Sequence, residues 1–383
     1  MKQLRISAQV IDEEDIQAAS EALRGELITR GPYVEKFENA FADYVGAKGA
    51  VTFNSGTSAL SAAYEAVEIT SYDRVITTPN TFVGTVAGAY LKGATVSYAD
   101  IDRHTGNVDI EKMAELMNEP RTRGKEILVP VHFAGQSVDM ALLEAQIKSP
   151  DTVIIEDACH AIGSLDPQGN KVGACTYSAM TVFSLHPAKN ITAMEGGIVT
   201  SNDSDLLNKL RIFRNNGIIK LSSCDEPWFY EVSAFTGNYN FTEVQGALGL
   251  SQLKKIEKWV KQREALREHY LKELEQIPNI RALSATSSTT SAWHLFVVFI
   301  DFEERGLCRT KVMQKLAYYG IQTQVHYIPL YLHLAVKNQS KIEDESFDQM
   351  QRYYSQALSL PFHCAMTKED ASYVMAQLKK TLL

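Results

Sequence analysis

Cysteine is scarce in this sequence, and acidic charge outweighs basic charge. The 383 residues include five cysteines, which are widely spaced and never form a C-x-x-C pair. This pattern argues against a disulfide framework or a zinc site, and we expect no bound metal. Lys and Arg number 38 against 46 Asp and Glu, a net charge of −8, so the basic surface that nucleic-acid binding requires is missing. Nucleic acid is therefore not expected as a partner.

Long apolar runs and nucleotide-binding fingerprints are missing as well. No stretch approaches the ~18 apolar residues of a membrane span, and the first residues turn acidic before any apolar run of signal-peptide length. We therefore expect a cytoplasmic protein without membrane contact. Neither G-x-G-x-x-G nor G-x-x-x-x-G-K-[ST] occurs, which removes the main support for a nicotinamide-dependent dehydrogenase or a P-loop protein.

Short apolar segments alternate with helical patterns through the first half of the chain. This alternation predicts an α/β fold in which helices wrap a mostly parallel sheet. An amphipathic helix is expected from Val34 to Tyr44, with Gly46 as its C-cap. The expected strands cover residues 50–53, 74–78, 94–98, 127–131, 153–156, 179–183 and 197–200.

The chain is longer than the roughly 250–300 residues at which a single core stops growing, so two domains are expected. A helical pattern runs from Thr242 to Val260, and the boundary is placed within it. We predict a large domain over 12–250 and a smaller C-terminal α+β domain over 251–383, with residues 1–11 packing on the latter. The expected elements of the smaller domain are strands near 294–300 and 322–326, a helix over 310–319, and a last helix begun by Thr367 with Asp370 as capping partner.

One lysine stands among small and uncharged residues between two expected strands. It is Lys189, in the segment FSLHPAKNITAMEGG at residues 183–197. A lysine is usually solvated. One held at the ends of buried strands is desolvated, its pKa falls from ~10.4, and the neutral amine can form a Schiff base. That is the chemistry that a pyridoxal cofactor needs.

A pair of acidic residues ends another expected strand, in the segment EDACHA at residues 156–161. Asp157 is either a plain cap of the following turn or a carboxylate that keeps a pyridine nitrogen protonated, which makes the ring an electron sink. Ligands bind at strand ends in open parallel sheets, which favours the second interpretation. His160 is either a core histidine or a neighbour of the ring's phenolic oxygen.

Two turns that follow strands and open helices have the character of binding loops. In NSGTSAL, at residues 54–60, backbone N–H groups and hydroxyls would point at an anion above the helix N-terminus. The same residue types also suit a plain capping turn. In TPNTFVGT, at residues 78–85, Phe82 either stacks on a flat ring or packs as an ordinary core aromatic.

These segments, in this order, resemble the DegT-type family of nucleotide-sugar aminotransferases, which share the fold type I architecture of aspartate aminotransferase. The likeness covers nearly the whole chain. It includes LITRGPYVEKFE at residues 27–38 and the block at 227–243, and the lysine loop is its most specific part. The resemblance implies a PLP-dependent transferase fold type I. It also implies pyridoxal 5′-phosphate (PLP) as cofactor, with pyridoxamine phosphate as the form that carries the amino group.

The resemblance assigns roles around the cofactor ring. Lys189 would join the cofactor covalently and shuttle the proton between cofactor and sugar carbons. Asp157 would pair with the ring nitrogen, His160 would lie near the phenolic oxygen, and Phe82 would stack on the ring.

The phosphate and the neighbouring subunit follow from the same resemblance. Gly56, Thr57 and Ser184 would hold the phosphate. Asn238 would reach the phosphate of the cofactor bound by a second copy of the chain, which implies a homodimer with shared active sites.

Within the family, QVHYIPLY at residues 324–331 and VHFAGQS at 131–137 look most like the transaminases of pseudaminic acid biosynthesis. Those enzymes move an amino group from L-glutamate to C4 of a UDP-linked 4-keto-6-deoxy-N-acetylhexosamine. By that resemblance Thr29, His326 and Tyr331 would lie near the sugar nucleotide.

Three positions depart from the family pattern and leave the sugar open. Gly237 and Asn240 replace the first tyrosine and the arginine of G-Y-N-Y-R, and Asn216 replaces the histidine of R-S-H-G. The alternatives are an aminotransferase for another nucleotide-linked 4-keto sugar, of the legionaminic or a dTDP-sugar pathway, and a non-catalytic regulator that binds PLP or a sugar nucleotide on the same fold. A dehydratase of this family carries histidine where this chain has Lys189, which argues against that activity.

Overall fold

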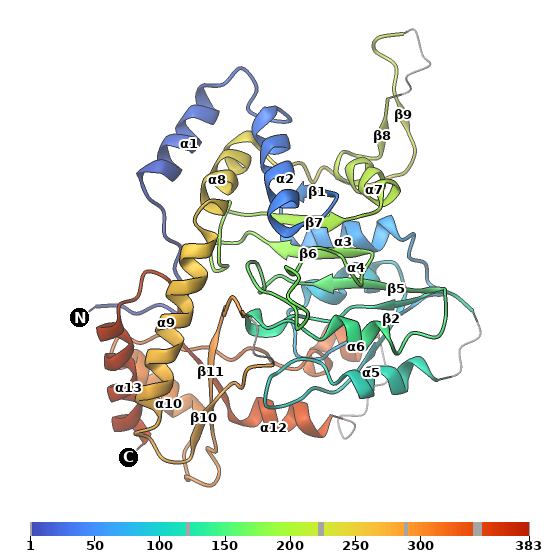
Figure 1. Cartoon of the computed structure of the whole chain (residues 1–383). Helices are drawn as coiled ribbons and strands as arrows, with labels where there is room; N and C mark the ends of the chain where they lie inside the picture. Colours follow the sequence, from blue (N-terminus) through green and yellow to red (C-terminus); the bar gives the residue numbers. More distant parts are fainter. Residues whose placement is uncertain (1, 120–122, 221–225, 287–289, 340–346, 383) are drawn as a thin grey trace.

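A computed structural model describes residues 2–119, 123–220, 226–286, 290–339 and 347–382, which form a large unit around a central sheet and a smaller unit below it in the view of Figure 1. The first half of the chain contains α1 (Glu13–Arg24), α2 (Pro32–Val45), β1 (Gly49–Phe53), α3 (Gly56–Ala66), β2 (Arg74–Thr77), α4 (Gly84–Leu91), β3 (Thr95–Tyr98), α5 (Ile110–Met117), β4 (Glu126–Leu128), α6 (Met140–Glu144), β5 (Thr152–Asp157) and β6 (Met180–Ser184). The second half contains β7 (Gly197–Ser201), α7 (Ser204–Arg214), β8 (Ile218–Ile219), β9 (Glu231–Val232), α8 (Glu243–Leu253), α9 (Ile256–Leu274), β10 (Ile280–Ala282), β11 (Phe296–Ile300), α10 (Arg309–Tyr318), α11 (Leu334–Lys337), α12 (Asp348–Gln356), β12 (Ala357–Leu360) and α13 (Lys368–Leu382). Short 3₁₀ turns lie at Phe133–Gly135 and Leu330–Leu332.

The central sheet has seven strands in the order β1-β7-β6-β5-β4-β2-β3. β7 runs antiparallel to its neighbours β6 and β1, and the other neighbouring pairs are parallel. The prediction of a mostly parallel α/β sheet is therefore confirmed. β4 ends at Leu128, earlier than expected, because Pro130 cannot donate to a ladder and Val131 forms only an isolated bridge with Asp157.

Helices cover both faces of this sheet, and the strand side chains alternate between them. Ile127 and Ile155 belong to a core that they share with α3 and α4, whereas their neighbours Leu128 and Ile154 belong to a core shared with Met113 of α5. A strand buried on both faces is apolar at successive positions, which is why these segments are continuous apolar runs. The polar residues at the ends of these strands therefore lie at the edge of a core that is packed on both faces of the sheet.

The amphipathic helix expected over 34–44 is α2. Its C-cap Gly46 adopts φ 81° and its N–H donates to the carbonyl of Ala42, so the predicted cap is confirmed. A left-handed backbone at this position suits glycine because it lacks a Cβ.

The single helix expected from Thr242 to Val260 is instead two helices, which is a correction. α8 ends at Leu253 and α9 begins at Ile256. The strand expected at 322–326 is also wrong. Ile321 bridges Leu4, whereas Gln324 bridges Ser359, so the segment changes partner after one pairing and builds no ladder.

The smaller unit contains the antiparallel sheet β10-β11-β12, with α9 and α13 packed beside it. Its last helix begins as predicted, because Thr367 and Asp370 exchange side-chain to backbone hydrogen bonds. Near the N-terminus, Lys2 pairs with Asp370 at 2.7 Å. The division into 12–250 and 251–383 stays a prediction, since one apolar cluster runs from the central sheet into β11 and β12.

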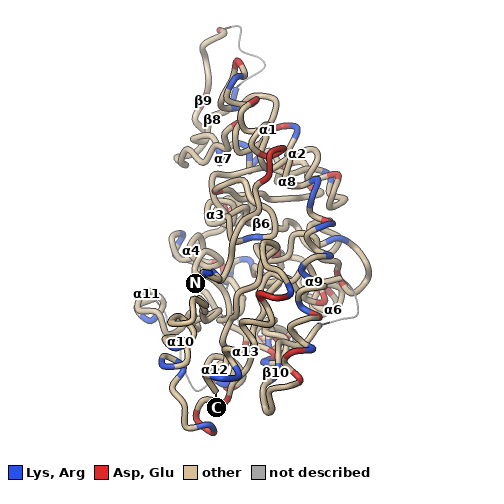
Figure 2. Tube along the Cα trace, turned by 90° about the vertical axis from the view of Figure 1, so that its left-hand side faces the viewer, with Lys and Arg blue, Asp and Glu red and all other residues tan. Residues whose placement is uncertain are grey.

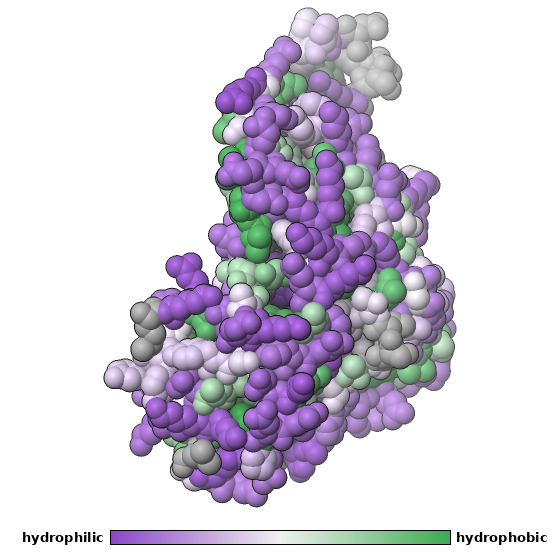
Figure 3. Space-filling view, turned by 60° about the vertical axis from the view of Figure 1, so that its left-hand side comes forward, coloured by the Kyte–Doolittle hydropathy of each residue, from purple (hydrophilic) through white to green (hydrophobic). Residues whose placement is uncertain are grey.

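Charges of both signs are interspersed along the trace (Figure 2). The face shown in Figure 3 is mainly hydrophilic, with apolar patches in its upper half. Over the described ranges, no helix combines the length and the apolarity needed to cross a bilayer. In the same part of the chain, no three His, Cys, Asp or Glu side chains come together as a metal site.

Candidate active site

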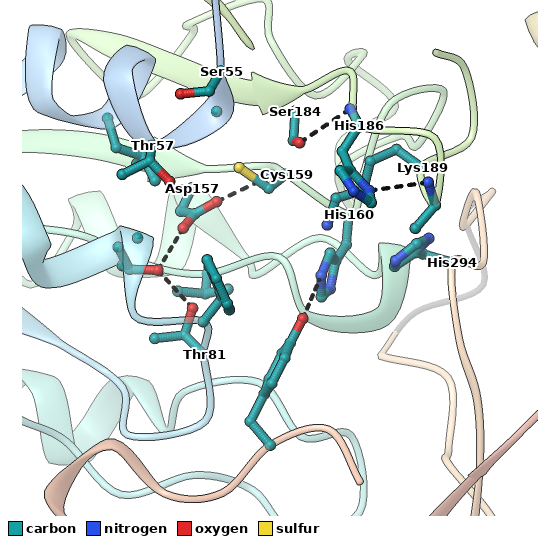
Figure 4. A pocket seen from close by; sticks show the side chains of 18 of the residues that line it. Ser55, Thr57, Thr81, Asp157, Cys159, His160, Ser184, His186, Lys189 and His294 are labelled. Carbon is teal, nitrogen blue, oxygen red and sulfur yellow. Dashed lines mark hydrogen bonds between the residues drawn. The ribbon is translucent and has the colours of Figure 1, made fainter. Parts of the chain in front are cut away.

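A cavity of about 380 Å³ lies where β5 and β6 end and α3 and α4 begin (Figure 4). Most of the predicted site residues line it, although they come from five separate segments of the chain. The predicted residues that line the cavity are Gly56, Thr57, Phe82, Asp157, His160, Ser184, Lys189 and His326.

The upper wall of the cavity in Figure 4 is the N-terminus of α3. Ser55 caps this helix in a reciprocal arrangement, in which its Oγ accepts the Ser58 N–H at 3.1 Å and the Ser58 Oγ accepts the Ser55 N–H at 3.1 Å. The cap does not use the amides of Gly56 and Thr57, which remain for a bound anion, and the helix dipole favours negative charge there. A Cβ on Gly56 would lie 3.1 Å from the Ser184 Cβ, so glycine permits the close approach of α3 and β6.

Asp157, the last residue of β5, is held by two donors. Its Oδ2 accepts from the Thr85 Oγ1 at 2.7 Å, and its Oδ1 accepts from the Cys159 N–H at 3.1 Å. The side chain is only 3% exposed. Thr85 lies in α4 and shares a further hydrogen bond with Thr81, so this carboxylate is fixed by the sheet and by the neighbouring helix together.

Lys189 lies in the loop between β6 and β7, at the opposite side of the cavity from Thr81 in Figure 4. Its backbone N–H donates to the His186 carbonyl at 2.8 Å. The next residue anchors the loop, because the Asn190 Nδ2 donates to the Ala292 carbonyl at 2.7 Å. Burial lowers the pKa of Lys189, while the nearby Cys159 and Asp157 oppose the shift. This direction agrees with the expected desolvation of a half-buried lysine, and the role of its amine stays a prediction.

Three histidines lie beside Lys189, and each is held neutral. Burial, followed by the charge of Lys189, lowers the pKa of His160 well below its usual value. Burial likewise lowers the pKa of His294 well below 6.5 and that of His326 to about 4. The rings of His160 and His294 are 4.4 Å apart, which adds a further cost to charging either one.

Several lining residues were not predicted as site residues. Thr85 lies within the quoted TPNTFVGT segment, in the first turn of α4, and Thr81 lies in the loop that precedes this helix. Tyr327 is adjacent to the predicted His326. His294 reaches the cavity from the segment before β11, and nothing in its local sequence distinguishes it from a core histidine.

Three predicted residues do not line this cavity. Thr29 is exposed and bridges Thr242, whereas Asn238 is exposed and its Oδ1 accepts from the Asn240 Nδ2 at 2.8 Å. Tyr331 is buried and stacks on Phe347, with ring centroids 4.6 Å apart. The substrate roles of Thr29 and Tyr331, and the role of Asn238 toward a second subunit, stay predictions.

The donor set of the cavity fits PLP. An anion site at a helix N-terminus, a desolvated primary amine and a buried carboxylate border one cavity, and its volume is in the range of small-molecule sites. Because Gly56 packs closely against Ser184, both residues border the cavity beside Thr57 at the start of α3, where a phosphate would meet helix N-terminal amides.

Comparisons with known proteins point to one family. The model of the DegT/DnrJ/EryC1/StrS aminotransferase family matches residues 9–379. The spore coat polysaccharide biosynthesis protein SpsC of Bacillus subtilis (strain 168) is 36% identical over 377 residues, covering 97% of this chain and 95% of that protein. A UDP-4-amino-4,6-dideoxy-N-acetyl-beta-L-altrosamine transaminase of Campylobacter jejuni (serotype O:23/36, strain 81-176) is 35% identical over 369 residues, covering 96% and 94%. The solved structure of Helicobacter pylori PseC, an aminotransferase involved in the biosynthesis of pseudoaminic acid, superimposes with a TM-score of 0.92 at 31% identity, covering 100% and 99%.

Proposed function

This chain belongs to the DegT/DnrJ/EryC1/StrS aminotransferase family, and we propose that it is a PLP-dependent aminotransferase for a nucleotide-linked sugar. In the proposed reaction, an amino group passes from L-glutamate to C4 of a UDP-linked 4-keto-6-deoxy-N-acetylhexosamine. The observation that carries the proposal is that Lys189, Asp157 and the N-terminus of α3 border one cavity. The choice of sugar, and a place in pseudaminic acid biosynthesis, rest on the named activities of the Campylobacter jejuni and Helicobacter pylori proteins.

The cofactor's phosphate would be held at the α3 end of the cavity. The amides of Gly56 and Thr57, with the hydroxyls of Thr57 and Ser184, supply the donors, and the helix dipole adds favourable electrostatics. Phe82 lines the same cavity, where its ring would stack on a flat aromatic group. Together these contacts would orient the cofactor between Asp157 and Lys189.

PLP, when bound, supplies an aldehyde that takes up the amino group and a ring that spreads negative charge away from the substrate carbon. Asp157 would hold a proton on the ring nitrogen, because its carboxylate is buried and rigidly oriented by Thr85 and Cys159. Lys189 would hold the cofactor through its Nζ and would move the proton at the substrate carbon. Burial lowers the pKa of Lys189, which makes its amine easier to deprotonate and so favours its role as a base.

A second copy of the chain would complete the site. Asn238 is exposed and lies outside the cavity of its own chain, so it is free to meet a neighbouring one. We therefore include in the proposal a homodimer with shared active sites.

A coupled assay tests the proposal. The purified protein, loaded with PLP and supplied with L-glutamate, is given a panel of 4-keto sugar nucleotides that includes both C5 epimers of the UDP-N-acetylhexosamine series and a dTDP-linked sugar. We expect 2-oxoglutarate to form together with one UDP-linked amino sugar. Preference for the dTDP-linked sugar would move the assignment to another pathway. Absence of 2-oxoglutarate with every sugar would overturn the transferase proposal.

A further inference from the structure

We propose that Tyr327, rather than His160, donates the hydrogen bond to the phenolic oxygen of the bound cofactor, and that His160 positions the Tyr327 hydroxyl. This inference rests on the proposed function for the presence of the cofactor. It changes the expected arrangement, in which His160 itself meets that oxygen. In Figure 4, His160 and His294 lie next to each other beside the cavity.

The hydrogen bonds around His160 determine which of its ring nitrogens carries the hydrogen. Its Nδ1 accepts from the Ala134 N–H at 3.4 Å. A neutral imidazole has one acceptor and one donor nitrogen, so the hydrogen is on Nε2. The ring is neutral because burial, Lys189 and His326 all lower the pKa of His160. The Nε2–H therefore faces the Tyr327 Oη, 3.0 Å away.

The Tyr327 hydroxyl therefore does not donate its own hydrogen to His160. Its oxygen accepts from His160, and among the described residues no other polar group bonds to that oxygen. Tyr327 lines the cavity, so its O–H can be donated to an acceptor there. His160 has both ring nitrogens occupied by Ala134 and Tyr327, and it has no donor left for the cofactor.

The backbone around Ala134 keeps the His160 ring in this orientation. The Ala134 carbonyl accepts from the His294 N–H at 2.7 Å, so one residue bonds to both histidines. The His294 ring lies 4.4 Å from that of His160 and limits its rotation. At Gly135, with φ 89°, a Cβ would lie 2.9 Å from the His294 nitrogen, so this close approach requires glycine.

Tyr327 is also fixed from other directions. Its backbone N–H donates to the Asn80 Oδ1 at 3.2 Å, and its ring meets the Phe133 ring edge-on at 6.3 Å. Burial, with the charge of Asp157, raises the pKa of Tyr327, so the phenol stays protonated and remains a donor. A neutral donor placed at an anionic oxygen stabilises that oxygen and makes the attached ring a stronger acid.

The first test is the pH titration of the visible absorption band of the bound cofactor, without substrate, in wild type and Tyr327→Phe. Loss of the donor is expected to raise the midpoint by about one pH unit, a tenfold change in proton affinity. Tyr373→Phe is the matched control, because the Tyr373 Oη donates to the Tyr319 carbonyl on the smaller unit, and its midpoint should equal that of wild type. A Tyr327→Phe protein with the wild-type midpoint would overturn the inference.

The second test needs no cofactor. In ¹⁵N-histidine-labelled protein free of PLP, NMR should show His160 as the neutral Nε2–H tautomer, with the signal assigned by its loss in His160→Gln. The Nδ1–H tautomer would overturn the inference. If wild type fails to bind PLP at all, the proposed function fails, while this measurement still decides whether His160 donates to Tyr327.

Discussion

At the scale of single residues, the site depends on charged groups whose surroundings are unusual. Asp157 is a buried carboxylate held by two donors, and Lys189 is a half-buried lysine whose pKa is lowered by burial. The role of each charge can be isolated by a substitution that removes the charged group and leaves the rest of the site in place.

Lys189→Ala is expected to abolish turnover, because no other amine among the cavity-lining residues can replace its Nζ. The phosphate site of α3 is unchanged in this variant, so the protein should still bind PLP reversibly. Borohydride treatment followed by mass spectrometry should label wild type and the exposed-lysine control Lys258→Ala, but not Lys189→Ala. Full activity in Lys189→Ala would contradict the assignment.

Asp157→Asn keeps the side-chain shape but removes the negative charge that would stabilise a protonated ring nitrogen of the cofactor. We expect kcat to fall roughly 100-fold or more, in the range found when an electrostatic stabiliser is removed from an active site. Steady-state kinetics with glutamate would measure the loss. The control is Asp139→Asn, an N-cap of α6 where asparagine serves equally well. A similar kcat in both variants would assign Asp157 to packing alone.

The pH dependence of stability is expected to reflect a buried histidine outside the cavity. Burial, followed by the charge of Arg263, lowers the pKa of His363 to about 4. At pH values between the pKa of this histidine in the unfolded chain and its pKa of about 4 in the folded protein, the unfolded chain binds more protons than the folded one. The free energy of unfolding therefore falls as the pH decreases. The contribution is roughly 2 kcal/mol between pH 7 and pH 5.

Chemical denaturation at several pH values checks this expectation. His363→Asn should flatten the slope of unfolding free energy against pH in that window, whatever its effect on absolute stability. His104→Asn, at an exposed position, should keep the wild-type slope. Parallel slopes for His363→Asn and wild type would contradict the prediction.

At the scale of elements, one carboxylate joins two helices that are distant in sequence. Glu243 opens α8 and is fully buried, and its oxygens accept from the backbone N–H groups of Gly31, Tyr33 and Val34 at 2.9, 2.6 and 3.2 Å. These amides lie at the N-terminus of α2, where intrahelical acceptors are missing. Glu243 thus supplies a cap that the residues beside α2 lack.

Glu243→Ala should destabilise the protein by about 2–4 kcal/mol, because three backbone amides, one buried and two part-buried, lose their acceptor. Glu243→Gln keeps one acceptor oxygen and should cost less. Thermal and urea unfolding measure the difference, with Glu268→Ala, on the exposed face of α9, as control. Equal stability of the alanine variant and wild type would show that other groups or water accept hydrogen bonds from the backbone amides at the N-terminus of α2.

At the scale of the whole molecule, the β8–β9 hairpin projects from the large unit (Figure 1) and carries apolar residues that a lone chain leaves uncovered. Trp228 is 74% exposed, and Phe235 is fully exposed. Large exposed aromatic groups on a projecting segment are typical of protein interfaces. A second copy of this chain is the partner that the proposed shared active site requires.

We expect the protein to sediment as a dimer at micromolar concentration. The double variant Trp228→Ser/Phe235→Ser should shift the equilibrium toward monomer, since burial of these rings favours association. Tyr318→Ser is the control, because that residue is equally exposed on α10 of the smaller unit. A monomeric wild-type protein would contradict the shared active site.

Local sequence was sufficient for the parts of the site that lie in contiguous segments. Asp157 ends a strand, whereas Lys189 and the turn at Gly56 follow one, and polar residues at strand ends are visible in the order of residues alone. The parallel sheet then brings the three together, because the carboxyl ends of parallel strands share one edge. Fold class and the reactive groups were therefore within reach of the sequence.

Only the tertiary structure determined which distant residues complete the site. Tyr327 and His294 reach His160 from segments more than a hundred positions away, and no periodicity encodes that meeting. The failed strand at 322–326 has the same origin, because its pairing partners Leu4 and Ser359 come from opposite ends of the chain. Sequence determines local conformation and chemistry, whereas long-range contacts depend on how whole elements pack, which is a property of the assembled core.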